Sequence, residues 1–186
     1  MELKQIEEDV RNILSEKRYY HSKCVMDVCE ELAHIYNVDV DTAKRVGMAH
    51  DIAKEMSKEE KLEYIEKNAI YADEIERENA GLLHAKIGAD IAIKKYGFTK
   101  EMGKAIEAHT TGKPNMGMLS KILYIADWTG IDREITDREE INDLAKVNID
   151  EAILYTLGIE IKTQIEENKQ IHIDSILARN YLLQSK

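Results

Sequence analysis

Apolar residues recur at three- and four-residue spacing along nearly the whole 186-residue chain. That spacing places apolar side chains on one face of a helix and is typical of amphipathic helices. No stretch alternates apolar and polar residues for long enough to require a strand. The pattern predicts an all-α protein, with helices near residues 2–16, 18–36, 40–54, 57–68, 72–96 (a break near Gly81 is left open), 99–110, 117–130, 137–146, 148–168 and 173–184.

Residues at the predicted helix ends support these boundaries. Ser57 and Glu60 have the spacing of a capping box, and Thr99 fits an N-cap. Gly97 fits the end of a helix, because glycine adopts the left-handed backbone that terminates many helices. Residues 111–115 are the clearest predicted loop, since they contain the only proline of the chain.

The length of 186 residues predicts a single domain. With one Phe and one Trp in the chain, aliphatic side chains must supply most of the core. The formal charge of -10 is spread along the chain and argues against nucleic acid or an anionic membrane as a partner. No apolar run is long enough to cross a bilayer. Cys24 and Cys29 lie five residues apart on one predicted helix, so we expect free thiols and a cytoplasmic protein.

Five predicted helices each turn a histidine or an aspartate toward the apolar face. A single buried histidine is usually a hydrogen-bonded core residue, so one case alone would indicate little. Five such groups are costly to bury unless they are paired or bound to a metal, and no matching set of inward Lys or Arg is visible. Imidazole and carboxylate donors suit iron, manganese, zinc or nickel. These residues are His21, His50, His84, His109 and Asp127.

The adjacent pair His50 and Asp51 sharpens this prediction. Neighbouring residues on a helix diverge by about 100°, so both can bind one ion only if that ion lies beside their turn. His21 and Asp127 would complete this first site. The second oxygen of Asp51 could bridge to another ion held by the two remaining histidines. Two ions about 3.5–4 Å apart can activate water and clamp a phosphoryl group.

The segments around these residues resemble those of a known family. They read RYYHSKCV around His21, AHDIAKE around His50, LLHAKIGAD around His84, AIEAHTTGKPNM around His109 and LSKILYIADWTGIDR around Asp127. Their order resembles the HD superfamily of phosphohydrolases, in its two-metal branch. The segments are similar to those of the YqeK-type bacterial symmetrical diadenosine-tetraphosphate hydrolases, over roughly residues 15–160. The stretch after Asp127 departs from the residues usual in that family.

The resemblance implies one HD-type helical bundle over residues 1–186, with a metal-binding core at about 15–135 and packing helices at about 137–184. It implies two metal ions, iron in this branch, with manganese, zinc or nickel as alternatives. One ion would be held by His21, His50, Asp51 and Asp127. The other would be held by Asp51, His84 and His109. The enzyme would cleave diadenosine tetraphosphate in the middle, to two ADP, through a metal-bound hydroxide.

Residues near these ligands are candidates to bind the substrate. Lys54 lies one turn after His50 and could contact a phosphate or be solvated. Trp128 could stack on a base or belong to the core. The expected catalytic residues are Asp51, Lys54 and Arg133. The expected substrate-binding residues are Lys54, Thr110, Thr111, Gly112, Lys113 and Arg133.

Two other functions remain open. An HD phosphohydrolase of another specificity, such as a nucleotidase or an alarmone hydrolase, would use the same metal ligands. A non-catalytic sensor that binds a nucleotide is the alternative outside enzymes, although such domains usually lose ligands. The expected partner is a small nucleotide in each case, and a homodimer is left open.

Overall fold

The computed structural model describes residues 1–184, and this part of the chain is built of α-helices without a strand. The predicted all-α fold is confirmed. The helices in chain order are α1 (Leu3–Ile13), α2 (Glu16–Tyr36), α3 (Val40–Ala49), α4 (Lys58–Lys67), α5 (Glu74–Glu78), α6 (Leu83–Tyr96), α7 (Lys100–Ala108), α8 (Met118–Thr129), α9 (Arg138–Val147), α10 (Ile149–Glu166) and α11 (Ile173–Gln184).

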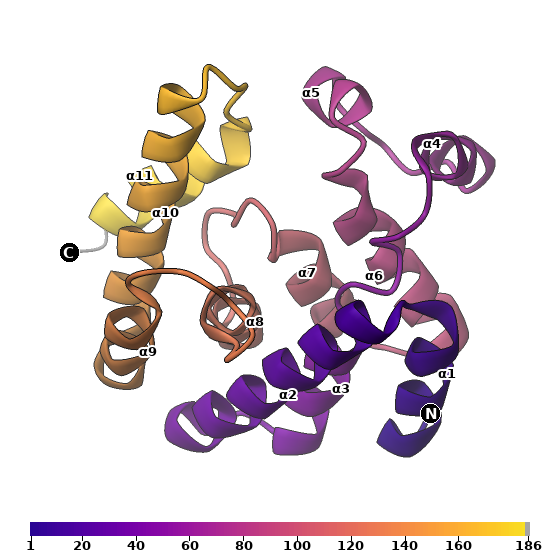
Figure 1. Cartoon of the computed structure of the whole chain (residues 1–186), viewed down its shortest axis with the longest axis horizontal. Helices are drawn as coiled ribbons and strands as arrows, with labels where there is room; N and C mark the ends of the chain where they lie inside the picture. The colour runs from indigo at the N-terminus through magenta and orange to yellow at the C-terminus, as the bar shows by residue number, and fades with distance from the viewer. Residues whose placement is uncertain (185–186) are drawn as a thin grey trace.

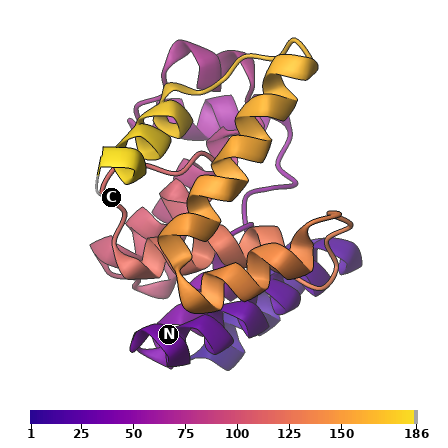
Figure 2. The same cartoon turned by 90° about the vertical axis from the view of Figure 1, so that its left-hand side faces the viewer.

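Helix α8 lies between the two halves of the molecule. It packs against α2, α3 and α7 on one side and against α9 and α10 on the other. Figure 1 shows α1–α3 at the bottom, α4–α6 above them at the right, and α9–α11 at the left. Figure 2, turned toward the C-terminal helices, shows α9, α10 and α11 in front of the rest. The C-terminal helices therefore form a wall beside the helices that precede them.

The main core gathers around α8, whose residues Leu123, Tyr124, Ile125 and Ala126 are all fully buried. A helix that is apolar on all sides is buried on all sides. Most of the largest fully buried side chains are Ile and Leu, as the composition predicts. This burial holds the polar residue that follows, Asp127, at the edge of the core.

The local capping signals act as predicted. The side chain of Ser57 accepts a hydrogen bond from the backbone of Glu60, and the Glu60 side chain accepts one from the Ser57 backbone. Thr99 caps α7. Gly97 ends α6 with a φ of 71°, in the left-handed region. These boundaries therefore follow from local chemistry.

One predicted helix end is wrong, and one break that the sequence left open is present; both matter for the site. The helix predicted over 40–54 ends at Ala49, because bonds from Ile52 N–H to Ala49 and from Lys54 N–H to Asp51 replace the α-helical ones with tighter turns. The helix predicted over 72–96 does break near Gly81, as the sequence left open, into α5 and α6. His50 and Asp51 therefore lie on a turn, where their side chains need not diverge as on a helix.

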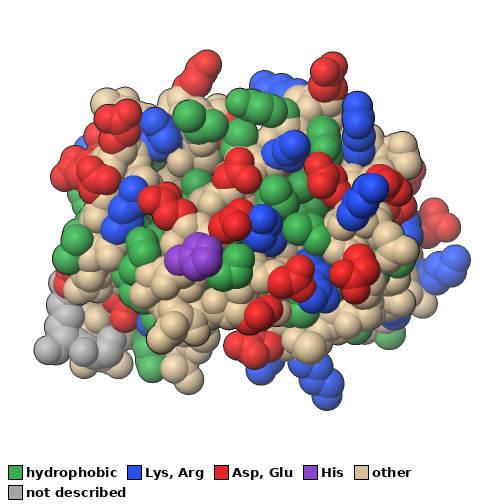
Figure 3. Space-filling model, turned by 90° about the horizontal axis from the view of Figure 1, so that it is seen from below, with side chains coloured by type: hydrophobic (Ala, Val, Ile, Leu, Met, Phe, Trp, Pro, Cys, Tyr) green, Lys and Arg blue, Asp and Glu red, His purple; other side chains and the backbone are tan. Residues whose placement is uncertain are grey.

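The remaining surface features agree with the composition. On the face shown in Figure 3, acidic and basic side chains are mixed, and hydrophobic side chains reach the surface between them. Cys24 and Cys29 are buried and free, as predicted. Within residues 1–184, no helix combines the length and the apolar character needed to cross a membrane.

Candidate metal centre

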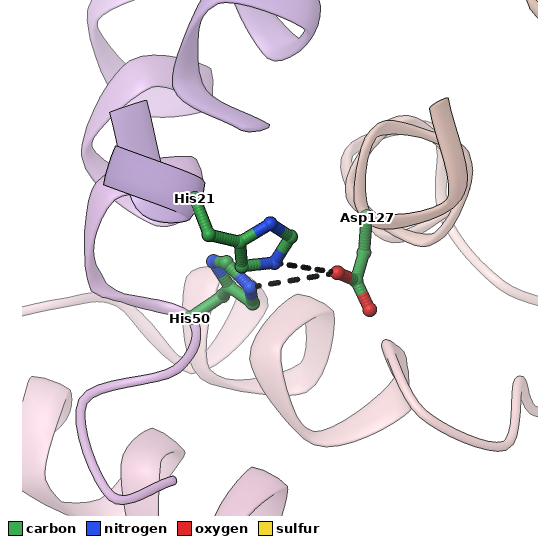
Figure 4. A group of neighbouring side chains, drawn as sticks. All are labelled: His21, His50 and Asp127. Carbon is green, nitrogen blue, oxygen red and sulfur yellow. Dashed lines mark hydrogen bonds and ion pairs between the residues drawn. The ribbon is translucent and has the colours of Figure 1, made fainter. Parts of the chain in front are cut away.

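The six predicted ligands come together, although they belong to five different parts of the chain. His21 lies on α2, His50 directly follows α3, and Asp127 lies on α8. The Asp127 Oδ1 atom is 2.9 Å from His21 Nε2 and 3.8 Å from His50 Nε2. Figure 4 shows the two imidazoles facing this carboxylate from the opposite side. These three residues form a group whose donor atoms are able to hold a metal ion.

A second group lies next to the first. The Nε2 atoms of His84 and His109 are 3.0 Å apart. Asp51 Oδ1 is 3.1 Å from His84 Nε2 and 3.6 Å from His109 Nε2. Metal–ligand bonds of about 2.0–2.2 Å leave neighbouring donor atoms about 3–3.5 Å apart. The spacing of both groups therefore suits donors arranged around an ion.

Asp51 lies between the two groups and turns one oxygen toward each. Its Oδ2 atom is 3.6 Å from His50 Nε2 and 3.9 Å from His21 Nε2. Its Oδ1 atom faces the other two histidines. The side chain is 2% exposed, so neither oxygen has much water available. A carboxylate in this position can serve both groups at once.

Backbone carbonyls orient three of the imidazoles. The Nδ1 atoms of His50, His84 and His109 lie 2.7, 2.5 and 2.6 Å from the carbonyl oxygens of Gly47, Gly81 and Ile106. A carbonyl accepts only, so each Nδ1 carries the proton and each Nε2 keeps its lone pair. All three lone pairs point into the centre. Metal-binding histidines are usually oriented in this way.

His21 is oriented by a carboxylate instead. Its Nδ1 atom is 2.8 Å from Asp132 Oδ2, in the loop after α8. Asp132 was not predicted from the sequence, because it lies in the stretch that departs from the family's usual residues and has no helical spacing to the ligands. A carboxylate behind a histidine fixes the ring and raises its basicity as a ligand. Asp132 therefore acts on the centre through His21.

The centre also contains buried polar atoms without hydrogen bonds. Among the described residues, His50 Nε2 and Asp51 Oδ1 are buried and have no hydrogen bond. Such atoms cost free energy unless something binds them. The residues present therefore fit metal ions.

The protonation states suit ligands as well. Burial lowers the pKa of His50 and of His84 to about 4, so both are neutral near pH 7. Burial opposes the ionisation of Asp51, but its electrostatic interactions with the neighbouring histidines and with Lys54 outweigh burial and hold the pKa of Asp51 well below its usual value. Metal ligands must be deprotonated in this way.

Three cationic side chains surround the opening of the centre. Arg18 Nη1 is 3.4 Å and Lys54 Nζ is 3.7 Å from Asp51, and Arg133 bonds Asp127 through its Nη2. Their side chains are 32%, 30% and 31% exposed, so each reaches both the centre and the solvent. Lys54 and Arg133 were predicted from the sequence to bind substrate. Arg18 was not, because in the sequence of α2 it looks like one of many surface cations. The three charges suit an anionic ligand.

The geometry does not support most of the predicted phosphate loop. Thr111 and Gly112 are buried, and the Gly112 N–H already donates to the Ala108 carbonyl. The Thr111 hydroxyl donates to the Gly112 carbonyl. Lys113 forms an ion pair with Glu107 at 2.5 Å and faces another cavity. Of these four residues, only Thr110 lines the cavity beside the ligands, and substrate binding by the other three stays a prediction.

That cavity has a volume of about 320 Å³ and runs from the candidate ligands to α10. It lies near the lower end of the range for small-molecule sites, about 300–1,000 Å³. Trp128 lines it and also packs against the core, so the core role is observed, while stacking on a base stays a prediction. The lining residues are His109, Thr110, Asp127, Trp128, Arg133, Ile135, Glu160, Thr163 and Gln164.

Asp73, Glu76 and His172 form a further group with donor atoms close enough for a metal. Here the atoms already have partners: His172 Nε2 is 3.0 Å from Asp73, and Lys86 is 2.6 Å from Glu76. Asp73 lies 99 residues from His172 in the chain, so no local sequence pattern indicates this pairing. The contact between His172 and Asp73 connects the start of α11 to the start of α5.

Comparison with known proteins places the fold and the centre in a family. A model of the HD domain matches residues 18–132, which include all six candidate ligands and Asp132. The chain belongs to the HD-domain family. The predicted resemblance is thereby confirmed.

Curated relatives of this HD-domain protein match it over most of their length. It is 33% identical to a protein of Halalkalibacterium halodurans, over 94% of this chain and 93% of that one. It is 30% identical to a protein of Bacillus subtilis, over 94% of each chain. Both are named symmetrical bis(5'-nucleosyl)-tetraphosphatase.

A solved structure has the same fold. The crystal structure of a protein from Clostridium acetobutylicum superposes with a TM-score of 0.95 and 37% identity, over 98% of this chain and 97% of that one. It is described as a predicted HD superfamily hydrolase involved in NAD metabolism. The HD fold therefore extends over nearly the whole chain, including the C-terminal helices.

Proposed function

We propose that this HD-domain protein is a symmetrical dinucleoside-tetraphosphate hydrolase that cleaves diadenosine tetraphosphate to two ADP. The observation that carries the proposal is the position of Asp51, with one oxygen facing each of two histidine groups. A bridging carboxylate is the feature expected of a two-metal phosphohydrolase. The names of the relatives from Halalkalibacterium halodurans and Bacillus subtilis support the substrate.

In this proposal, His21, His50, Asp51 and Asp127 hold one ion, and Asp51, His84 and His109 hold the other. Nitrogen and carboxylate donors without thiolate suit iron, with manganese, zinc and nickel as alternatives. Such ions, when bound, activate water and compensate charge on a phosphoryl group.

The chain's own cations bind the rest of the tetraphosphate. Arg18, Lys54 and Arg133 neutralise phosphate oxygens, which an acidic protein must do locally. Arg133 is prepared for this contact, because its Nε–H donates to the Asp127 carbonyl at 2.7 Å and holds the guanidinium in place. Thr110 adds a hydroxyl at the same wall. Since ADP is a good leaving group, no dedicated general acid is required.

The C-terminal helices have a role in the proposal beyond packing. The sequence predicts a metal-binding core at about residues 15–135 and packing helices at about 137–184, and α10, which lines the cavity, belongs to the predicted packing helices. The cavity binds one nucleoside half of the substrate. The phosphates bind at the opening of the cavity, beside Arg18, Lys54 and Arg133. This division places the bond to be cleaved beside Asp51.

Product analysis tests the proposal. The metal-loaded protein is incubated with diadenosine tetraphosphate, and the nucleotides are separated by chromatography during the first turnovers. We expect ADP alone, with no AMP or ATP at any time, and no products after the metal is removed with a chelator. AMP with ATP, or no cleavage, would refute the symmetrical reaction.

A second substrate class is favoured by one comparison. The Clostridium acetobutylicum protein is described as involved in NAD metabolism, and NAD is also a dinucleotide with a phosphoanhydride. Including NAD, mononucleotides and an alarmone in the same assay separates these functions. A value of kcat/KM for any of them above that for diadenosine tetraphosphate would favour the alternative.

A further inference from the structure

The α10 wall of the cavity carries three polar residues on one helix face. Glu160, Thr163 and Gln164 are spaced by three and four residues, and all three line the cavity. The other walls contribute two of the candidate ligands, His109 and Asp127, together with Arg133 and the apolar Trp128 and Ile135. The cavity therefore combines a charged part that suits phosphates, a polar face on α10 and apolar surface from Trp128 and Ile135.

Glu160 differs from the acidic residues of the metal centre. Asp51 and Asp127 each contact histidines and a cation. Within residues 1–184, Glu160 takes part in no ion pair, and its one hydrogen bond comes from the Tyr124 hydroxyl at 3.3 Å. Burial raises the pKa of Glu160 to about 7. A carboxyl group without a cation would repel a phosphate, so this wall suits an uncharged part of the ligand.

We propose that Glu160, with Gln164 beside it, hydrogen-bonds the Watson–Crick edge of the substrate's purine and selects adenine over guanine. This inference rests on the proposed function, because it concerns the nucleoside half of that substrate. Trp128 and Ile135 would cover the faces of the base.

The complementarity follows from hydrogen-bond chemistry. The Watson–Crick edge of adenine offers an acceptor at N1 and a donor at its amino group. A neutral carboxylic acid offers one donor and one acceptor in the matching order. Guanine offers two donors on the same edge, and these match an ionised carboxylate. Proteins that read single bases commonly contact this edge. The proton on Glu160 therefore decides the preference.

Other titratable and charged groups face the same region, and the test must separate their effects from that of Glu160. They lie on α8, after α7, in the loop after α8 and before α11, and are Tyr124, Asp127, His109, Arg133 and His172. Titration of these groups should affect kcat/KM equally for an adenine and a guanine substrate that share the same phosphate chain. The ratio of the two kcat/KM values therefore isolates the base contact.

The experiment compares diadenosine with diguanosine tetraphosphate as substrates of the metal-loaded protein. In the wild type, the adenine-to-guanine ratio of kcat/KM should fall as the pH rises through about 7, because the donor on Glu160 is lost. Glu160→Gln keeps one donor and one acceptor, so its ratio should favour adenine and stay constant with pH. Glu160→Ala should lower the ratio about tenfold, the value of one or two hydrogen bonds.

Glu166→Gln is the matched control, since Glu166 lies on the same helix with its side chain 64% exposed and outside this cavity. It should behave as the wild type. A ratio unaffected by Glu160→Ala, or a pH-dependent ratio in Glu160→Gln, would overturn the proposal. If the wild type cleaves neither substrate, the proposed function fails, and calorimetric affinities for ADP and GDP in the same variants then test Glu160 by the same ratios.

Discussion

Asp132 offers the sharpest test of how the centre is built, because it touches a candidate ligand and lies outside the ligand set. Its Oδ2 atom accepts a hydrogen bond from His21 Nδ1 at 2.8 Å, and its side chain is 20% exposed. Replacing it with alanine leaves the His21 ring without its partner. The Nε2 lone pair of His21 then loses both orientation and basicity.

The magnitude follows from this single charge-assisted bond. Loss of the carboxylate behind a metal-binding histidine typically costs 10–100-fold in metal affinity or activity, or about 1.4–2.7 kcal/mol. Asp132→Ala should fall in that range. Asp132→Asn should lie between alanine and the wild type, because its amide oxygen still accepts the bond but carries no charge.

The assay is a metal titration against a chelator of known affinity, with bound metal measured by mass spectrometry. Glu134→Gln is the matched control, since Glu134 is an exposed acid two residues away in the same loop. It should leave the affinity unchanged. An affinity in Asp132→Ala equal to that of the wild type, with the fold intact by circular dichroism, would refute the argument. An equal loss in Glu134→Gln would assign the effect to net charge instead.

Three further predictions follow from the structure. Asp51→Ala should reduce bound metal to less than one ion per chain and abolish turnover, measured by mass spectrometry and product assay; retained activity would exclude Asp51 as a bridge. The metal-free protein should lose stability as the pH falls from about 6.5 to 4, by up to roughly 3 kcal/mol for each of His50 and His84. The reason is that these two imidazoles take up protons at a higher pH in the unfolded chain than in the folded protein. Equal urea midpoints at pH 7 and pH 5 would contradict this prediction. Gly47→Ala would place a Cβ 2.9 Å from Met26 Cα, between α2 and α3. It should lower the free energy of unfolding by about 1–3 kcal/mol, measured by urea denaturation. An unchanged midpoint would show that the two helices can move apart without loss of stability.

Local chemistry accounts for the parts of the fold that the sequence predicted well. Ser57, Thr99 and Gly97 act through bonds that span a few residues, so their effects are visible in the chain itself. The end of α3 was predicted wrongly, because no breaker follows Ala49 and the helical pattern continues through Lys54. The tight turn at His50 and Asp51 positions two candidate ligands, but no residue type in the local sequence indicates it.

The sequence by itself predicted which histidines and aspartates meet in the core, because such a residue on an apolar helix face must find a partner there. Only the tertiary structure decided which partners assist those ligands. In the sequence, Arg18, Asp132 and Glu160 look like ordinary surface residues. Lys113 lies in the predicted loop but lines a different cavity. Helical periodicity reports which way a side chain points from its own helix. The contacts of a loop or an exposed face depend on how segments about 30 to 110 residues apart pack together, and the hydrophobic pattern does not encode that arrangement.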